Sequence, residues 1–228
     1  DYYIYLQYAR NLNETGQFAF NPGHPSLGFT SSLWVMLLGA GFSHIHPHWF
    51  PKLLSFSLYL SAMLLFWRLL RKQVGPYFAL WGTALLCLNP WVWRWSLSGM
   101  ETTAALLVSI LVLNAWWQEK DWLWIPLGLL PLLRPELLVW ALAGMLWFLW
   151  KRRFMPALLS SLPMGIWLLF SRLTFGSWFP NTAHAKAGGF SFTLAIHALK
   201  KIVLTLQPVD LIALVLGIAF LWRQRRQG

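Results

Sequence analysis

Apolar runs separated by short polar segments follow one another along most of this 228-residue chain, and they constrain its fold more than any other feature. Residues 15–51 contain no Asp, Glu, Lys or Arg, and neither do residues 122–133. Only 11% of the residues are charged, whereas a soluble domain usually carries about 25%. The pattern therefore argues against a soluble globule and predicts a helical protein that lies in a membrane.

The runs predict eight apolar helices, at residues 30–46, 53–70, 76–92, 102–118, 122–133, 137–150, 154–171 and 205–222. A full crossing needs roughly 20 residues at a rise of about 1.5 Å each, so several of these helices are expected to be tilted, broken or shielded by neighbours. The predicted fold class is all-α, a polytopic transmembrane helical bundle.

Two domains are expected within this bundle. Residues 1–30 carry charged and polar groups and predict a loop outside the hydrocarbon core with an amphipathic juxtamembrane helix. Residues 31–228 predict the transmembrane helical domain. Because the chain begins at Asp1 without Met or a signal peptide, we expect it to be a fragment that continues beyond both ends.

Lys and Arg gather in three clusters beside apolar runs: Arg68/Arg71/Lys72, Lys151/Arg152/Arg153 and Arg223/Arg225/Arg226. The positive-inside rule puts all three in the cytoplasm, and even numbers of apolar runs separate them. The polar segments 98–103, 134–136 and 172–189 then face outward together and predict the walls of one site. Asp1 faces outward as well only if the run 30–46 does not cross; the alternative, with residues 68–72 outside, stays open.

The net charge of +11 and the single Cys exclude several classes of function. Basic clusters next to apolar runs are typical of topology signals and anionic-lipid contacts, whereas a nucleic-acid-binding protein carries a basic face on a soluble fold. Cys87 alone cannot form an intrachain disulfide or a multi-Cys metal site. The expected partners therefore include membrane lipids and exclude nucleic acid.

Two polar strings have structural interpretations that stand beside any functional one. Ser98-Gly-Met-Glu101 has the spacing of a capping box, in which Ser and Glu side chains bond backbone N–H groups at a helix start. Arg134-Pro-Glu136 also suits a helix start, because Pro fits the first turn and an acid suits the positive end of the dipole. That account leaves Arg134 unexplained, since a cation is unfavourable there.

Four groups of short strings occur in order over about residues 1–190 and carry the functional signal. The first group comprises Asp1-Tyr-Tyr-Ile-Tyr, Asn21-Pro-Gly23 and Gly28-Phe-Thr30-Ser-Ser-Leu-Trp34. The others are Ser98-Gly-Met-Glu101-Thr, Arg134-Pro-Glu136 and Phe175-Gly-Ser-Trp-Phe-Pro180-Asn-Thr-Ala-His184-Ala-Lys186. Together they resemble the GT-C class of bacterial membrane glycosyltransferases, including arabinofuranosyltransferases and dolichyl-phosphate-mannose mannosyltransferases. This sequence departs from the family's strings at three places. Phe29 stands where the family usually has Tyr, and Leu137 stands where it has Gly. The family's Arg precedes Tyr-Ala, whereas here Arg10 follows them in Gln7-Tyr-Ala-Arg10.

The resemblance implies transfer of a sugar from a polyprenyl-phosphate donor to a glycan, lipid or protein acceptor, with inversion, on the extracytoplasmic face of a bacterial inner membrane. It implies that residues 1–30 are an extracytoplasmic catalytic loop, and it implies Asp1 and Glu101 as catalytic residues, with Asp1 taking the acceptor's proton. Residues implied for substrate and donor-phosphate binding are Arg10, Asn21, Thr30, Arg134, Glu136, Asn181, His184 and Lys186. It implies no certain cofactor, and a divalent metal ion held by Asp1 stays an open alternative.

Two other functions remain open. A transporter or flippase of lipid-linked sugars would also be helical, but its polar groups would lie near the membrane midplane and its halves would repeat. An inactive accessory membrane subunit would have a degenerate site. An acid directly before Asp1 would favour the enzyme over the accessory subunit.

Overall fold

The computed structural model describes residues 2–42, 46, 48–181 and 200. The chain divides into two units, residues 1–185 and 186–228, and the described residues belong almost entirely to the first unit. The architecture below is that of this unit. Asp1, His44, His184, Lys186 and the cluster Arg223/Arg225/Arg226 lie outside the described residues.

The described part of the chain is mostly helical, which confirms the all-α class. The N-terminal elements are α1 (Tyr2–Thr15), a short antiparallel pair β1 (Ala19–Asn21) and β2 (His24–Pro25), and α2 (Ser32–Gly41). The remaining α-helices are α3 (Phe50–Val74), α4 (Pro76–Leu88), α5 (Pro90–Ser96), α6 (Thr102–Trp117), α7 (Trp124–Leu133), α8 (Leu138–Trp150) and α9 (Phe154–Phe175). Two 3₁₀ turns, η1 (Asp121–Leu123) and η2 (Pro135–Leu137), precede α7 and α8.

Prolines in the first turn begin several of these helices. Pro51, Pro76 and Pro90 occupy this position in α3, α4 and α5, where the missing N–H would have no helical partner. The side chain of Asn89 caps α5 by accepting hydrogen bonds from the backbone N–H groups of Trp91 and Val92, at 2.9 and 3.3 Å. The run predicted at 76–92 is therefore two helices, α4 and α5, rather than one.

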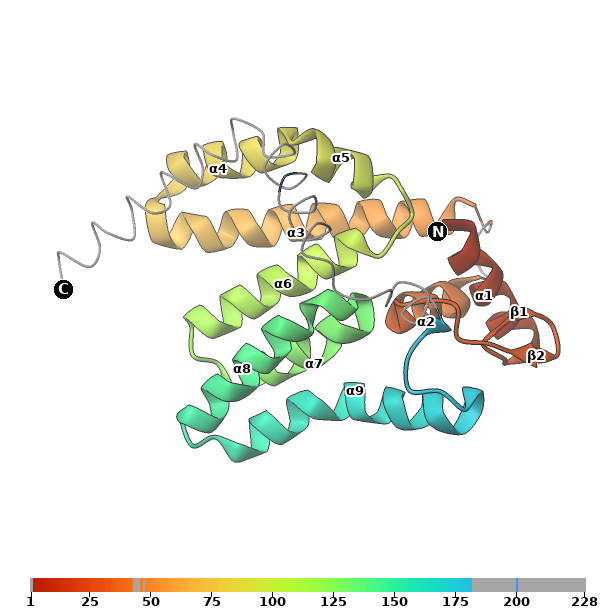
Figure 1. Cartoon of the computed structure of the whole chain (residues 1–228). Helices are drawn as coiled ribbons and strands as arrows, with labels where there is room; N and C mark the ends of the chain where they lie inside the picture. Colours follow the sequence, from red (N-terminus) through yellow and green to blue (C-terminus); the bar gives the residue numbers. More distant parts are fainter. Residues whose placement is uncertain (1, 43–45, 47, 182–199, 201–228) are drawn as a thin grey trace. The chain divides into compact units, whose positions relative to one another are not determined.

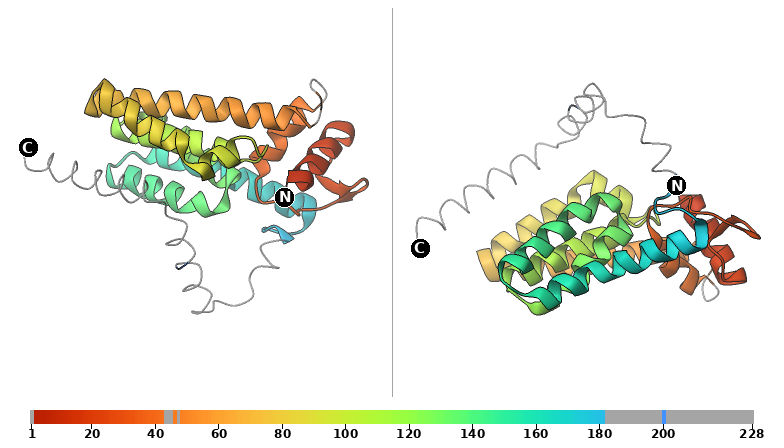
Figure 2. Two further views of the ribbon diagram at one scale, coloured as in Figure 1. Left: turned by 90° about the horizontal axis from the view of Figure 1, so that it is seen from above. Right: turned by 60° about the horizontal axis from the view of Figure 1, so that its bottom comes forward.

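The longer helices run back and forth between two ends of the unit (Figures 1 and 2). One end holds α1, α2, the β-hairpin and the turns before α6 and α8, and we call it the polar end. The other holds the turns after α3, α6 and α8, and we call it the basic end. There, Lys151 pairs with Glu119 at 3.4 Å and Arg153 pairs with Asp121 at 2.8 Å, which joins two of these turns.

The buried core is continuous with the N-terminal segment at the polar end. Trp34 of α2 is fully buried, and its indole Nε1 donates to the Gly99 carbonyl at 3.3 Å. Phe18 meets Trp167 of α9 edge-on, with ring centroids 5.6 Å apart. Residues 2–41 therefore pack onto the ends of the long helices, and α2 is about 15 Å long, half of a typical hydrocarbon core.

Among the described helices, α3 and α9 are long and apolar enough to cross a membrane, judged by length and composition. Many of their apolar side chains face outward, including Leu60 and Leu64 on α3 and Ile166 and Leu173 on α9. Shorter apolar helices accompany them, namely Ser32–Gly41, Pro76–Leu88, Thr102–Trp117, Asp121–Leu133 and Pro135–Trp150. These features favour association with a membrane.

Candidate functional site

Glu101 is a buried carboxylate at the polar end, directly before the first residue of α6. Only 4% of the residue is exposed. Its Oε1 lies 3.4 Å from an Arg134 guanidinium nitrogen, and its buried Oε2 has no hydrogen-bond partner in the described part of the chain. A buried carboxylate oxygen without a partner is costly, which makes this position a candidate site.

The capping-box interpretation of this string is wrong. Helix α6 begins at Thr102, so its N-cap position is Glu101 and not Ser98, and no side chain caps it. The Ser98 hydroxyl instead donates to the Trp95 carbonyl at 2.8 Å and accepts from the Met100 N–H at 3.2 Å. Ser98 thus orders the turn before the helix, and the Glu101 side chain is directed elsewhere.

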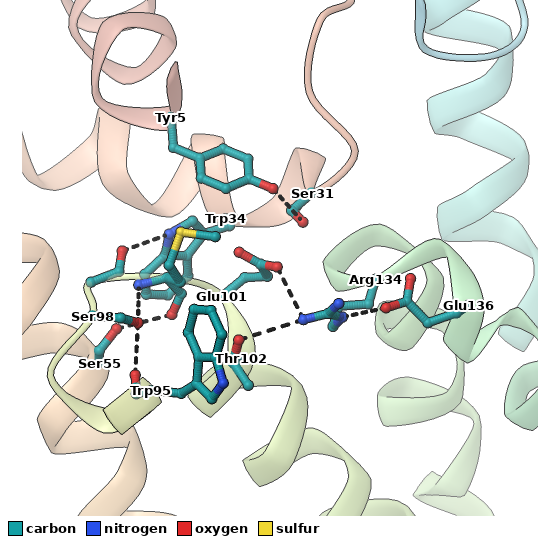
Figure 3. A network of polar contacts seen from close by, with 12 residues as sticks. Tyr5, Ser31, Trp34, Ser55, Trp95, Ser98, Glu101, Thr102, Arg134 and Glu136 are labelled. Carbon is teal, nitrogen blue, oxygen red and sulfur yellow. Dashed lines mark hydrogen bonds and ion pairs between the residues drawn. The ribbon is translucent and has the colours of Figure 1, made fainter. Parts of the chain in front are cut away.

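The turn that carries Glu101 is held by several other elements (Figure 3). Gly99 has a φ of 71°, and an added Cβ would lie 2.6 Å from the Tyr2 ring. The Met100 carbonyl accepts a hydrogen bond from the Ser55 hydroxyl of α3 at 3.0 Å. With Trp34 bonded to the Gly99 carbonyl, α1, α2 and α3 all fix this turn, and so they fix the position of the carboxylate.

Arg134 joins the turns before α6 and α8. Its Nε lies 2.6 Å from Glu136 Oε1, and one terminal nitrogen is 3.5 Å from the Thr102 hydroxyl as well as near Glu101. The side chain of Arg134 is 37% exposed and that of Glu136 is 58% exposed, whereas the side chain of Glu101 is 6% exposed. The guanidinium therefore reaches from solvent to the buried carboxylate.

The helix-start interpretation of Arg134-Pro-Glu136 is confirmed. Pro135 occupies the first turn of η2, and Glu136 is the acid in that turn. Arg134, which that interpretation left unexplained, precedes the turn in extended backbone and uses its guanidinium to bridge the two carboxylates. The same string therefore begins a helical turn and also contributes to the polar cluster.

Tyr5 and Ser31 complete the cluster from α1 and the segment before α2, and the sequence did not single them out. The Tyr5 hydroxyl donates to Ser31 Oγ at 3.1 Å, with Thr30 also close, and Figure 3 shows this pair above the Glu101 carboxylate. Burial raises the pKa of Tyr5, and the negative charge of Glu101 raises it further. A usable signal was the i, i+3 spacing of Tyr5 and Tyr8, which marks one buried face of α1.

The pKa of Glu101 is raised above its ordinary value because burial disfavours the charged form. A backbone hydrogen bond and the positive charge of Arg134 lower the pKa of Glu101, and the negative charge of Glu136 raises it. A carboxyl with a raised pKa is a stronger proton acceptor than an ordinary one, which is the property that a general base needs. It can also hold Arg134 in place by charge alone.

The structure brings together some of the predicted site residues and not others. Glu101, Arg134 and Glu136 form the cluster, with Thr30 beside Tyr5. The Asn181 N–H donates to the Leu27 carbonyl at 2.9 Å. The string that runs from Phe175 to Lys186 therefore passes next to the loop before Thr30.

Arg10 and Asn21 lie elsewhere at the polar end. Arg10 pairs with Glu14 on the exposed side of α1, at 2.8 Å, and lines an open pocket of about 600 Å³. Asn21 is exposed in the β-hairpin, opposite His24. No contact within the described ranges joins either residue to Glu101 or Arg134.

Asp1, His184 and Lys186 lie outside the described residues, so their predicted roles stay predictions. His46 and His48, which flank Pro47, have ring centroids 5.7 Å apart. Within the described segments, no three His, Cys, Asp or Glu side chains gather as a ligand set.

Comparison of this chain with models of protein families, with curated proteins and with solved structures finds no match. The functional interpretation therefore depends on the polar cluster itself. Its defining features are one buried carboxylate, one guanidinium that bridges two acids, and a fixed turn that holds them.

Proposed function

We propose that this chain is part of an integral membrane glycosyltransferase that moves a sugar from a polyprenyl-phosphate donor to an extracytoplasmic acceptor, with inversion. The observation that carries the proposal is the ion pair between Glu101 and Arg134. These residues come from two strings 33 positions apart, each of which resembles a string of such enzymes. Their meeting in one cluster that reaches from solvent to a buried carboxylate is what a shared site requires.

The proposed topology is polytopic, in a bacterial inner membrane, with the polar end outside. Its support is the distribution of charge between the two ends. Lys151 and Arg153 lie at the same end as Arg71 and Lys72, whereas Glu101 and Arg134 lie at the other. Cations gathered at one end agree with the positive-inside rule.

The proposed reaction is a direct displacement at the anomeric carbon. Asp1 takes the proton of the acceptor hydroxyl, and that oxygen forms a bond to the anomeric carbon. The bond from this carbon to the phosphate oxygen breaks, and the polyprenyl phosphate leaves with the electron pair. Because the nucleophile enters opposite the leaving group, the configuration inverts.

Arg134 is the proposed partner of the leaving phosphate. Its planar guanidinium can form two parallel hydrogen bonds to phosphate oxygens. In the structure the Arg134 Nε bonds the Glu136 carboxylate. Because this carboxylate is exposed, another anion such as a phosphate can easily replace it. Glu101 keeps hold of the opposite side of the guanidinium, and Lys186 is the proposed second cation.

The experiment is incubation of the full-length protein, in proteoliposomes, with a panel of polyprenyl-phosphate sugars and mass spectrometry of the products. We expect transfer from at least one donor, and a loss of about 100-fold or more in Asp1→Asn, as when a general base is removed. Glu14→Gln is the matched control, since Glu14 is exposed and pairs only with Arg10 in the described part of the molecule.

Two outcomes would contradict the proposal. Movement of a donor across the bilayer without product would identify a transporter or flippase. Failure with every donor, in protein whose thermal unfolding is normal, would favour an inactive accessory subunit. Normal transfer by Asp1→Asn would remove Asp1 from the base role.

A further inference from the structure

A pocket with an apolar wall and three cations lies at the basic end, about 24 Å from the Glu101 turn along the sixteen residues of α6. Its volume is about 460 Å³. The last two turns of α3 and the C-terminal part of α6 form its walls, through Leu65, Arg68, Arg71, Lys72, Asn114 and Gln118. Nothing in the proposed sugar transfer uses this pocket.

The three cations of the pocket have no acidic partner among the described residues. Arg68, Arg71 and Lys72 are spaced i, i+3 and i+4, which gathers them on one face of α3. In the segments that the structure describes, none of them lies within ion-pair distance of an acid. By contrast, Lys151 and Arg153 at the same end are both paired.

The helix dipoles account for only part of this charge. Cations suit the C-terminus of a helix, which carries roughly half of one negative charge. The ends of α3 and α6 together offset about one positive charge of the three. A surplus of about two positive charges therefore faces the pocket, and like charges on one face repel each other unless an anion lies between them.

The rest of the lining suits a ligand that is anionic at one end and apolar at the other. Asn114 and Gln118 side chains are bonded to each other at 2.6 Å and keep further donors and an acceptor. Leu65 and Leu69 add apolar wall, and the Arg71 guanidinium lies 5.1 Å from the Trp67 ring centroid. Outside the pocket, α3 and α4 expose large apolar side chains, including Leu64, Phe78 and Trp81.

We propose that this pocket binds the phosphate headgroup of an anionic phospholipid. The phosphate lies among Arg68, Arg71 and Lys72, the amides of Asn114 and Gln118 bond the headgroup's hydroxyl and phosphate oxygens, and the acyl chains follow the exposed apolar face of α3. Basic pockets between helices at the cytoplasmic side of a membrane favour this class of ligand. A free phosphate shares the anionic chemistry but would leave the apolar wall uncovered.

The experiment measures lipid binding to the full chain in detergent by native mass spectrometry, with dioleoyl phosphatidylglycerol as the probe and dioleoyl phosphatidylcholine as the neutral reference. The double variant Arg68→Gln/Lys72→Gln should bind phosphatidylglycerol about tenfold more weakly than the wild type. Lys151→Gln/Arg152→Gln is the matched control, because it removes the same charge at the same end but outside the pocket. Its binding should change less than about twofold.

A second variant keeps the result decisive if the double variant unfolds. Asn114→Asp keeps the size of the side chain and its acceptor for Gln118, and it puts a carboxylate into the pocket. We expect it to weaken phosphatidylglycerol binding and to leave phosphatidylcholine binding unchanged. Equal losses in the pocket variant and its control would overturn the proposal in favour of general surface attraction.

Inorganic phosphate separates the two sources of the ligand. We expect it to displace phosphatidylglycerol only at concentrations at least about 100-fold higher than the lipid, because it cannot cover Leu65 and Leu69. Displacement at equal concentration would assign the pocket to a soluble phosphate and overturn the lipid proposal.

Discussion

At the scale of single residues, Glu101 is the position where stability and function oppose each other. Its carboxylate is buried, one oxygen has Arg134 as its partner, and the other has none in the described part of the chain. Such a group lowers the stability of the fold, since an unsatisfied buried polar atom costs about 1–3 kcal/mol. Proteins keep such groups where the charge is needed.

The pH dependence of stability tests this interpretation. The pKa of Glu101 in the folded state lies above its ordinary value of 4.5, so the folded form holds the proton more tightly than the unfolded form. Proton binding by Glu101 therefore stabilises the folded form fully below the ordinary pKa, and this stabilisation is lost as pH rises through the raised pKa. Glu101→Gln removes this titration.

We expect Glu101→Gln to be more stable than the wild type at pH 7, by on the order of 1 kcal/mol, and about equal to it near pH 4. Thermal unfolding in detergent across this range measures the difference. Sugar transfer should fall by at least about tenfold, because the charge that holds Arg134 is gone. A constant stability difference at all pH values would contradict the raised pKa, and Glu14→Gln serves as the exposed control.

Replacement of Arg134 separates charge from geometry. Arg134→Ala leaves Glu101 without its ionic partner, so we expect a loss of turnover and lower stability, smaller than the about 3–5 kcal/mol of a fully buried pair because Arg134 is 37% exposed. Arg134→Lys should restore activity only in part, since one ammonium cannot bond Glu101 and Glu136 as a planar fork does.

Kinetics and thermal unfolding of both Arg134 variants, together with the double variant Arg134→Ala/Glu101→Gln, complete the test. If the ion pair matters for stability, Glu101→Gln should stabilise the Arg134→Ala background more than it stabilises the wild type, because in that background it removes a buried charge that has lost its partner. Unchanged turnover in both single variants would remove Arg134 from the phosphate role. An equal effect of Glu101→Gln in the wild-type and Arg134→Ala backgrounds would show that the two residues are not coupled.

The sequence predicted the strings of this site better than it predicted their local geometry. Glu101, Arg134 and Glu136 were named from short motifs, and all three gather. The capping box failed because the spacing of Ser98 and Glu101 does not reveal which residue begins α6. Tyr5 was missed because its role arises from packing of α1 over a turn nearly a hundred residues away.

At the scale of elements, apolar runs predicted helices well but not where they break. The run at 53–70 lies within α3, which continues through the charged residues to Val74. The run at 76–92 splits because Pro90 has no N–H to donate to the previous turn, and Asn89 caps the new helix. Apolar character marks the lipid or core environment, whereas proline and polar caps set the boundaries.

The contact between α7 and α9 depends on a small residue. A Cβ added to Gly128 would lie 2.9 Å from the Ser160 carbonyl oxygen and 2.9 Å from Pro163 Cγ. Close approach of helices at small residues is a common source of packing in membrane proteins. Gly165 of α9 is the natural control, because a Cβ there would meet nothing within 4 Å.

We expect Gly128→Ala to destabilise the fold by about 1–3 kcal/mol, because α7 and α9 must move apart. Gly165→Ala should be neutral or stabilising by up to about 1 kcal/mol, since Ala is the better helix former. Thermal unfolding of the two variants in the same detergent measures the contrast. Equal behaviour would mean that the α7–α9 contact is looser than the structure describes.

At the scale of the whole molecule, two clusters of cations share one end. The polar end has a buried carboxylate and its guanidinium partner, whereas the basic end has one cluster of cations in the last turns of α3 and a second at the turn after α8, where Lys151 and Arg153 pair with acids. The even number of runs between these clusters predicted that they share one side, and the path of α4 through α8 agrees with that expectation (Figure 1). The run 30–46 gives a helix of only ten residues at the polar end.

The last prediction concerns which side of the membrane each end faces. In a Cys87→Ala background, single Cys residues replace positions at the two ends that are at least partly exposed: His24 and Ser177 at the polar end, and Lys120 and Arg152 at the basic end. An impermeant maleimide applied to bacterial spheroplasts should label the polar-end pair at once. The basic-end pair should react only after permeabilisation, because crossing helices and the positive-inside rule put those turns in the cytoplasm.

Each pattern of labelling has a distinct meaning for the fold and for the site. Labelling of the basic end alone would reverse the orientation and put Glu101 and Arg134 on the cytoplasmic side, where an extracytoplasmic acceptor cannot reach them. Labelling of both ends without permeabilisation would mean that the helices do not cross. The short helices α2, α7 and α8 would then be those of a protein bound to the membrane surface. Labelling of the polar end alone requires crossings between the ends, and among the described helices only α3 and α9 reach the length of a full span unaided. The 10–16-residue helices α6, α7 and α8 would then cross where neighbouring helices shield their ends or where the bilayer thins around them.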